Sequence, residues 1–238
     1  PGALSFDAAT SIQRDGRLII SKVHGDFKGL EFPTPIGRPV VTDLEFEFAA
    51  RLEEMKRLSV VDATYHCLED GSDLLNGTGV FSIRFDDASY NLQVVSRGPV
   101  SRMSELSGIA GLDLVRGDFD ATIRVLGKGD SYDIVVSTGL SDLEGHYSEM
   151  VFEDHRLESK LDAKMTGGQI QLNNFSVQLR KSYTDAGSIR FNGGYDLDTE
   201  TGNVQFQSVG INRHLFGALL DSRIQTERLG EAELKLEG

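Results

Sequence analysis

Apolar and polar residues alternate with a period of two along most of this chain. The clearest run ends at Val125, and every second residue in it is apolar: Phe119, Ala121, Ile123 and Val125. Successive side chains of a strand point to opposite faces of a sheet, so this run is typical of a strand with one buried and one solvated face. The pattern recurs at 44–48, 81–85, 90–94, 132–136, 157–165, 189–191 and 204–206.

Short turn-forming sequences separate the alternating runs. They are Asp86-Asp87, Gly127 to Asp130, Gly193-Gly194 and Thr201-Gly202-Asn203. Short strands joined by such turns are typical of antiparallel hairpins. A doubly wound parallel sheet requires crossover helices between its strands, and the sequence shows none. We therefore predict a mainly β fold built of antiparallel hairpins, with a few short helices.

Three stretches have helical spacing of their apolar residues. They are His214 to Asp221, Val100 to Leu106 after Pro99, and Ala49 to Leu58, which fits an extended connection equally well. The first two each follow a hairpin that contains Ser-Ile-Arg-Phe, so 79–106 and 187–220 form a weak internal repeat. The two copies begin too far apart for a solenoid period, and we interpret them as a repeated unit on a long sheet.

The stretch from Gln169 to Leu179 changes phase partway along. Ile170 and Leu172 share one phase, whereas Phe175, Val177 and Leu179 have the opposite phase. A bulge at Asn173-Asn174 would add one residue and keep all five apolar side chains on one face.

Composition limits the classes of partner. The chain has 238 residues, of which 39% are hydrophobic, and this is sufficient for a core. A net charge of −13 argues against binding to nucleic acid or to an anionic membrane surface. There is also no apolar run of about 18 residues that would span a membrane as a helix.

We expect residues 1–238 to form a single elongated β-rich domain. The chain begins with Pro1-Gly2, and near its other end Ala232, Leu234 and Leu236 alternate with charged residues as at the start of another strand. These features predict a segment of a longer protein, with any membrane tether outside the segment.

The single cysteine, Cys67, excludes an internal disulfide framework and a zinc site made of several cysteines. Adjacent strand residues point to opposite faces, so His66 and Cys67 are poorly placed to act as a nucleophile pair. Alternation puts Cys67 with Val61, Ala63 and Tyr65, which predicts a packed thiol.

Two stretches contain residue types that bind cations. His146 to His155 holds two histidines and three acidic residues, but strand alternation divides the acids between faces, and we interpret it as a solvated hairpin. Asp196 to Asn203 resembles a shortened calcium loop, but the same residues suit a polar turn. Gly127 to Ser131 lacks the spacing of a phosphate-binding loop. We predict no metal, no cofactor and no catalytic residue.

Several segments together resemble the AsmA-like family of bacterial envelope proteins and its TamB-like lipid-bridge relatives. The segments are ELSGIAGLDLVRGDFDATIRVLGKGDSYDIVVSTGLSDLEGHY at 105–147, GGQIQLNNFSVQLRKSYTDAGSIRFNGGYDLDTETGNVQF at 167–206, and the hairpin-helix unit at 79–106. The resemblance lies in alternation and glycine placement. It implies a long twisted antiparallel sheet that curls into a groove. The chain lacks the usual N-terminal membrane helix of the family.

The resemblance also implies a function. Related envelope proteins hold or conduct phospholipid or other lipid acyl chains along an apolar groove between two membranes. For this chain it predicts a non-catalytic periplasmic or cell-envelope segment, with lipid and other envelope proteins as partners. The expected groove residues are Phe119, Ile123, Val125, Ile134, Val136, Ile170, Leu172 and Phe191. Two alternatives stay open: a structural or interaction module, either a β-sandwich or a β-solenoid, and an enzyme such as a metal-dependent hydrolase.

Overall fold

The computed structural model describes residues 3–13, 17–32, 40–102, 111–148, 150–182, 184–212 and 233–236. All of the described strands belong to one antiparallel sheet, and their order in the sheet follows their order in the chain. They are β1 (Ala3–Ile12), β2 (Leu18–Phe32), β3 (Val40–Glu53), β4 (Arg57–Glu69), β5 (Ser72–Arg84), β6 (Ser89–Pro99), β7 (Leu112–Lys128), β8 (Ser131–Tyr147), β9 (Met150–Thr166), β10 (Gln169–Lys181), β11 (Thr184–Asp196), β12 (Thr201–Asn212) and β13 (Glu233–Leu236). The predicted mainly β, antiparallel fold is confirmed.

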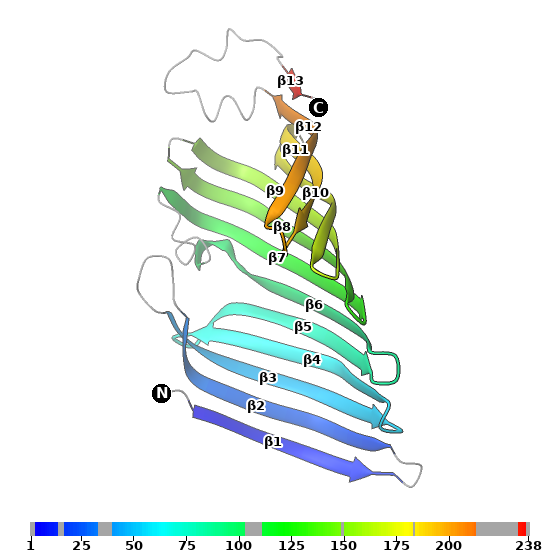
Figure 1. The fold of residues 1–238 in the computed structure, drawn as a ribbon. Coiled ribbons are helices and arrows are strands. Elements are labelled where there is room, and N and C mark those ends of the chain that lie inside the picture. The colour runs from blue at the N-terminus through cyan, green and yellow to red at the C-terminus, as the bar shows by residue number, and fades with distance from the viewer. Residues whose placement is uncertain are drawn as a thin grey trace. The chain divides into compact units, whose positions relative to one another are not determined.

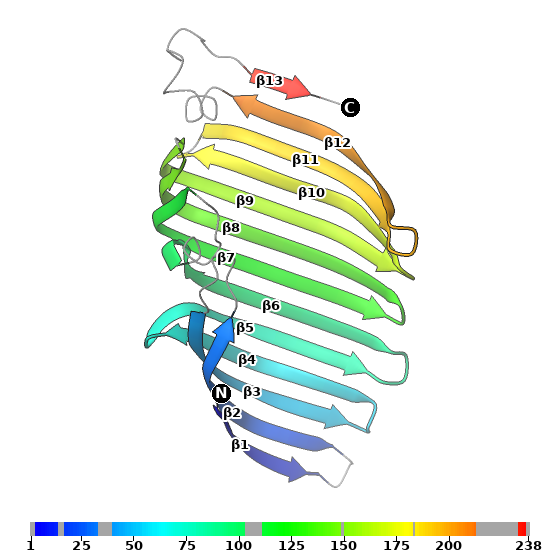
Figure 2. The ribbon, with the colours of Figure 1, turned by 60° about the vertical axis from the view of Figure 1, so that its left-hand side comes forward.

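The sheet divides into two compact units. Unit 1 comprises Pro1–Gly98 and Ala121–Asp133, and unit 2 comprises Pro99–Asp120 and Ile134–Gly238. In unit 1, β1 to β6 lie side by side in chain order (Figure 1). In unit 2, β9 to β12 do the same (Figure 2).

Helical structure is limited to 100–102 within the described residues. The predicted helix from Val100 therefore begins as expected, but 103–106 lie outside the described residues, as does the predicted helix His214 to Asp221. Residues 49–58 adopt the extended alternative. They form the end of β3, a tight turn in which Lys56 N–H donates to Glu53 O at 2.8 Å, and the start of β4.

Two of the four predicted turns are confirmed and two are wrong. Asp86-Asp87 and Gly129-Asp130 lie in turns, whereas Gly193-Gly194 lies within β11 and Thr201 begins β12. A Cβ on Gly193 would lie 2.3 Å from the backbone oxygen of Asn203. This glycine therefore permits a close approach between strands, as glycines inside strands often do.

The predicted bulge in β10 is confirmed. Leu172 pairs with Ala163 of β9 and Asn174 pairs with Asp162, so β10 contributes one extra residue at this point. The pairing with β11 contains the same extra residue. Leu172 pairs with Gly193 and Phe175 with Phe191, so β10 advances three residues where β11 advances two.

A second bulge, in β4, corrects the face assigned to Val61. Asp62 has a left-handed φ of 53°, and β4 contributes one extra residue between Val60 and Ala63. Val60 therefore takes the place expected for Val61, which is 42% exposed. Because both residues are valine, the alternation fits either phase.

Buried apolar side chains are few. Unit 2 has a small cluster of Val100, Leu114 and Leu143, with half-buried Leu112, Phe119, Leu140, Phe152 and Leu157 around it. In unit 1 the only buried hydrophobic residues among those described are Ala50 and Ala121. The larger apolar side chains of unit 1 are therefore partly accessible on the faces of the sheet.

Candidate functional site

One face of unit 1 is apolar across five strands, and we call it the unit 1 apolar face. The strand pairings align its residues into rows across β2 to β6. The rows include Leu18, Leu52, Leu58, Ile83 and Tyr90; Ile20, Ala50, Val60, Phe81 and Leu92; and Phe27, Leu44, Cys67 and Leu75. The intervening residues, on the opposite face, are mainly polar, as in the row Ile19, Arg51, Ser59, Ser82 and Asn91.

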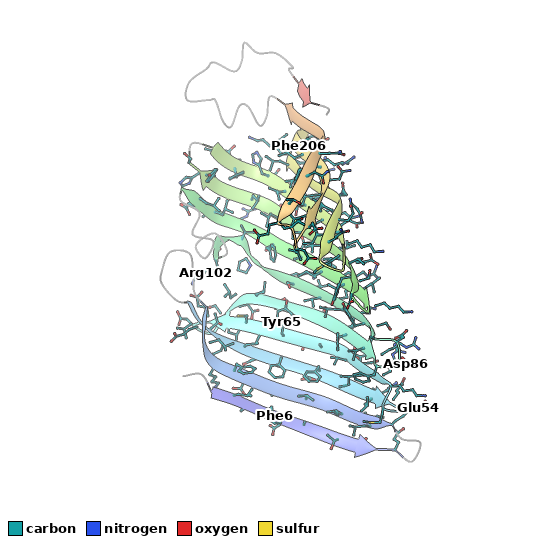
Figure 3. All side chains as sticks on the ribbon, in the orientation of Figure 1. Phe6, Glu54, Tyr65, Asp86, Arg102 and Phe206 are labelled. Carbon is teal, nitrogen blue, oxygen red and sulfur yellow. The ribbon has the colours of Figure 1, made fainter. Side chains whose placement is uncertain are left out.

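Aromatic rings on this face lie over glycines of the neighbouring strand. The ring of Phe46 covers Gly25, whose added Cβ would meet the ring at 2.4 Å. Tyr65 of β4 passes over Gly77 of β5, and its hydroxyl group hydrogen-bonds the hydroxyl group of Ser96 on β6. Figure 3 labels Tyr65 on β4. A ring that lies along the sheet projects less from it, so Phe46 and Tyr65 extend less far above the backbone of this face.

Unit 2 has a corresponding surface, the unit 2 apolar face, on β9 to β12. Its rows are Met165, Ile170 and Tyr195; Ala163, Leu172, Gly193 and Val204; Leu161, Phe175, Phe191 and Phe206; and Ser159, Val177 and Ile189. The Phe191 ring centroid lies 4.7 Å from that of Phe175 and 5.8 Å from that of Phe206. Aromatic contacts at such distances are favourable beyond the area they bury.

Five of the expected groove residues share the unit 2 apolar face. Ile170, Leu172 and Phe191 lie in its rows directly. Ile134 and Val136 are assigned through Thr138, whose hydroxyl group lies 2.6 Å from that of Ser159 in the same face. Because Ile134 and Val136 are an even number of residues from Thr138 on β8, they point to the same side.

The other three expected residues lie on β7. Phe119 belongs to unit 2, where it is half-buried against the Val100, Leu114 and Leu143 cluster. Ile123 and Val125 belong to unit 1, with Ile123 38% exposed and Val125 half-buried.

Sequence reasoning left out the unit 1 apolar face. Its alternation was visible at 44–48 and 81–85, but alternation alone does not distinguish a face covered by a second layer from one that stays accessible. The structure shows that this face stays accessible, because few large apolar side chains of unit 1 are buried in its described part.

The opposite face of unit 2 is polar and ionic. Arg180 donates to Asp185 at 3.1 Å and to Gln178 at 3.0 Å, and Gln178 donates to Asp185 at 2.8 Å. A depression on this side is lined chiefly by polar groups, among them Ser137, Glu158, Lys160 and Ser176. Because its side chains are polar and largely exposed, this is the solvated face of unit 2. Exposed pairs of this kind contribute little to stability.

The two histidines of the 146–155 stretch have different environments. His146 is half exposed beside Asp113, with Nδ1 3.9 Å from the carboxylate. His155 is 3% exposed, its Nδ1 accepts the N–H of Glu153 at 2.9 Å, and its ring meets the Phe152 ring edge-on at 5.5 Å. Burial, assisted by the charge of Lys181, lowers the pKa of His155. In the part of the chain that the structure describes, no three His, Cys, Asp or Glu side chains come together in a way that could hold a metal.

The calcium-like stretch forms the polar turn that the sequence favoured. The Asp196 carboxylate accepts the N–H groups of Asp198 at 2.9 Å and Thr199 at 3.0 Å. The Thr199 N–H is the main cause of the lowered pKa of Asp196. The left-handed residue of this turn is Glu200, with φ 54°.

Comparison with known proteins gave no match to a family model, to a curated protein or to a solved structure. Among the described residues, no helix has the length and apolar character needed to cross a bilayer. The candidate site is therefore defined by geometry alone, as two apolar sheet faces.

Proposed function

We propose that this chain is a non-catalytic segment of a cell-envelope protein and that its apolar faces hold or conduct lipid acyl chains. The observation that carries the proposal is the unit 1 apolar face, which spans five strands while only alanines are buried hydrophobic residues in the described part of that unit. An apolar sheet face is stabilised when something covers it. Exposed apolar surfaces of this kind mark interaction sites.

Acyl chains suit such a surface because they have no polar groups to satisfy. Within its aligned rows the unit 1 apolar face carries aliphatic and aromatic side chains together with Cys67, and charged residues such as Glu47 and Arg51 lie on the other face. An acyl chain loses no hydrogen bonds on entering these surroundings, whereas a polar group would incur a desolvation cost. The rings of Phe46 and Tyr65 lie over Gly25 and Gly77, where no side chain projects from the backbone.

The resemblance to AsmA-like proteins supports the same proposal. The resemblance adds to the proposal a periplasmic or envelope location, attachment through a region outside this chain, and other envelope proteins as partners. The alternative of a structural or interaction module differs in what covers the apolar faces. A sandwich would cover them with a second sheet, but every described strand belongs to one sheet.

Photo-crosslinking at neighbouring residues tests the proposal. A benzophenone amino acid is placed at Leu92 or at Val177, each on an apolar face, and separately at the adjacent Gln93 or Gln178 on the opposite face. After incubation with phosphatidylcholine vesicles and irradiation, mass spectrometry should detect lipid adducts at Leu92 and Val177 and few at their neighbours.

Equal labelling of both members of each pair, or adducts at none of the four positions, would contradict the lipid function. Native mass spectrometry of the unmodified protein adds an independent readout, because retained phospholipid should appear as a discrete mass increment.

A further inference from the structure

One depression on unit 1 has more positive than negative side chains. It lies at the end of the sheet where the β3–β4 and β5–β6 turns meet, and the Phe85 N–H of one turn donates to the Lys56 O of the other at 2.7 Å. Figure 3 labels Glu54 and Asp86 at this end of the unit. Three carboxylates line the depression together with four basic side chains, which are Arg17, Lys56, Arg57 and Arg84. In the whole chain, by contrast, acidic residues outnumber basic ones by 37 to 24.

Two of these arginines directly oppose each other. Arg57 is the first residue of β4, Arg84 is the last residue of β5, and the two residues pair across the strands. Like charges in this arrangement are destabilising. Arg84 has a partner in Asp86 at 3.4 Å, whereas none of the carboxylates in the described part of the chain forms an ion pair with Arg57. An anion between the two guanidinium groups would remove their repulsion.

The unit 1 apolar face begins directly beside these arginines. Leu58 and Ile83 are the next pair along β4 and β5, and they lie on the opposite face because successive strand side chains alternate. In the turns beyond the strands, Met55 and Phe85 are 75% and 53% exposed. A molecule that straddles this end of the sheet would therefore meet arginines on one side and apolar side chains on the other.

We infer that this end of unit 1 binds the headgroup of a zwitterionic phospholipid whose acyl chains lie on the unit 1 apolar face. The phosphodiester accepts hydrogen bonds from Arg57 and Arg84, because a planar guanidinium group matches two phosphate oxygens. The ammonium group of the headgroup lies beside Asp86 and replaces Arg84 as the partner of that carboxylate. The inference rests on the proposed lipid function and adds to it the position and the class of the headgroup.

The charges of the depression select the class of headgroup. Its three carboxylates, Glu53, Glu54 and Asp86, would repel a headgroup with only negative charge, such as phosphoglycerol. The net charge of −13 adds to this repulsion. A phosphocholine or phosphoethanolamine headgroup carries one charge of each sign, so the arginines and the carboxylates both gain a partner of opposite charge.

Short-chain lipids that dissolve as monomers test the inference. Dihexanoyl phosphatidylcholine carries the headgroup, dihexanoyl phosphatidylglycerol replaces it with an anionic one, and dihexanoylglycerol has the same acyl chains without phosphate. Calorimetric titration of the unmodified protein should show the tightest binding for the phosphatidylcholine.

Arg57→Gln and Arg84→Gln should each weaken phosphatidylcholine binding about five- to tenfold, because each removes a charge-assisted hydrogen bond to the phosphate. Neither variant should change the affinity for dihexanoylglycerol. Both arginines are exposed, so both variants should fold normally. The matched control Arg97→Gln removes the same charge from the polar face near the other end of β6 and should leave all three affinities unchanged.

Nuclear magnetic resonance provides a readout at the site itself. The Nε–H signals of Arg57 and Arg84, assigned from the two glutamine variants, should shift on addition of the phosphatidylcholine and not on addition of dihexanoylglycerol.

The outcomes separate this inference from the proposed function. Equal binding of phosphatidylcholine and dihexanoylglycerol, or unchanged phosphatidylcholine binding in both arginine variants, would overturn the headgroup site and leave the acyl-chain function standing. Tighter binding of the phosphatidylglycerol would overturn the zwitterionic class. Binding of none of the three lipids would overturn both the headgroup site and the lipid function.

Discussion

At the scale of single residues, Gly77 shows how a glycine serves strand packing. A Cβ there would lie 2.1 Å from the backbone oxygen of Val95 and 2.7 Å from Cζ of Tyr65. We expect Gly77→Ala to lower the free energy of unfolding by about 1–3 kcal/mol, because the backbone oxygen cannot move aside as a side chain can.

The matched control for this prediction is Gly79→Ala, on the same strand and the same face. Its Cβ would find its nearest neighbour, the backbone oxygen of Gln93, at 3.5 Å, an ordinary contact. It should be neutral or stabilise by up to about 1 kcal/mol, since alanine restricts the unfolded chain. Urea unfolding curves of the two variants measure the difference, and equal destabilisation would show that the close approach is not the cause.

The buried imidazole of His155 makes stability depend on pH. Its pKa is lowered in the folded state from an ordinary value of 6.5, so the unfolded chain takes up a proton at a higher pH than the folded chain does. The contribution of His155 to the free energy of unfolding should therefore be constant above about pH 6.5, fall as the pH decreases towards the lowered pKa, and level off below it.

His155→Asn is the control, because an amide oxygen can accept the Glu153 N–H without titrating in this range. Melting temperatures between pH 5 and 7.5 should depend less on pH in this variant than in the unmodified protein. The same dependence in both would place the titrating group elsewhere.

At the scale of the strand, the bulge in β10 predicts that deleting a residue at the bulge and deleting a regularly paired residue have different effects on stability. The extra residue lies between Leu172 and Phe175, so deletion of Asn173 leaves a regular strand that retains the pairings on both sides of the bulge. The loss should be about 1 kcal/mol, mainly from the hydrogen bond that Asn173 donates to Asp162 at 2.9 Å.

Deletion of Ser176 should be far more damaging. It moves Val177 and Leu179 to the polar face, because a shift of one residue reverses the direction of every later side chain. Circular dichroism and thermal melts should show a folded Asn173 deletion and a strongly destabilised Ser176 deletion. If both deletions melt alike, the bulge does not accommodate the extra residue as described.

At the scale of the whole chain, a charge of −13 coexists with accessible apolar faces. If the faces take up lipid as proposed, transfer of a fluorescent phospholipid should be faster from neutral phosphatidylcholine vesicles than from anionic phosphatidylglycerol vesicles. Electrostatic repulsion slows the encounter with the anionic surface, and salt should narrow the difference. Equal rates at low salt would indicate that the net charge does not control the approach to the membrane.

The local pattern of the sequence predicted parts of most strands from β3 onward, two of the turns and the β10 bulge, but it assigned no run to β1 or β2. Alternation depends on the pleat of a single strand, and the phase change after Leu172 had only one economical explanation. The same reasoning misjudged Val61, because adjacent valines at 60 and 61 make both phases apolar. It also misjudged Gly193, because glycine suits a turn and a close strand contact equally well.

The sequence by itself determined the fold class, the separation of polar from apolar faces and the net charge, since each depends on composition or on neighbouring residues. Only the tertiary structure decided that Tyr65 crosses Gly77 to reach Ser96, that His155 is buried, and that the apolar face of unit 1 has no large buried side chains in its described part. These features arise from strand register, which brings together residues far apart in the chain, and register is set by the pairing of whole strands.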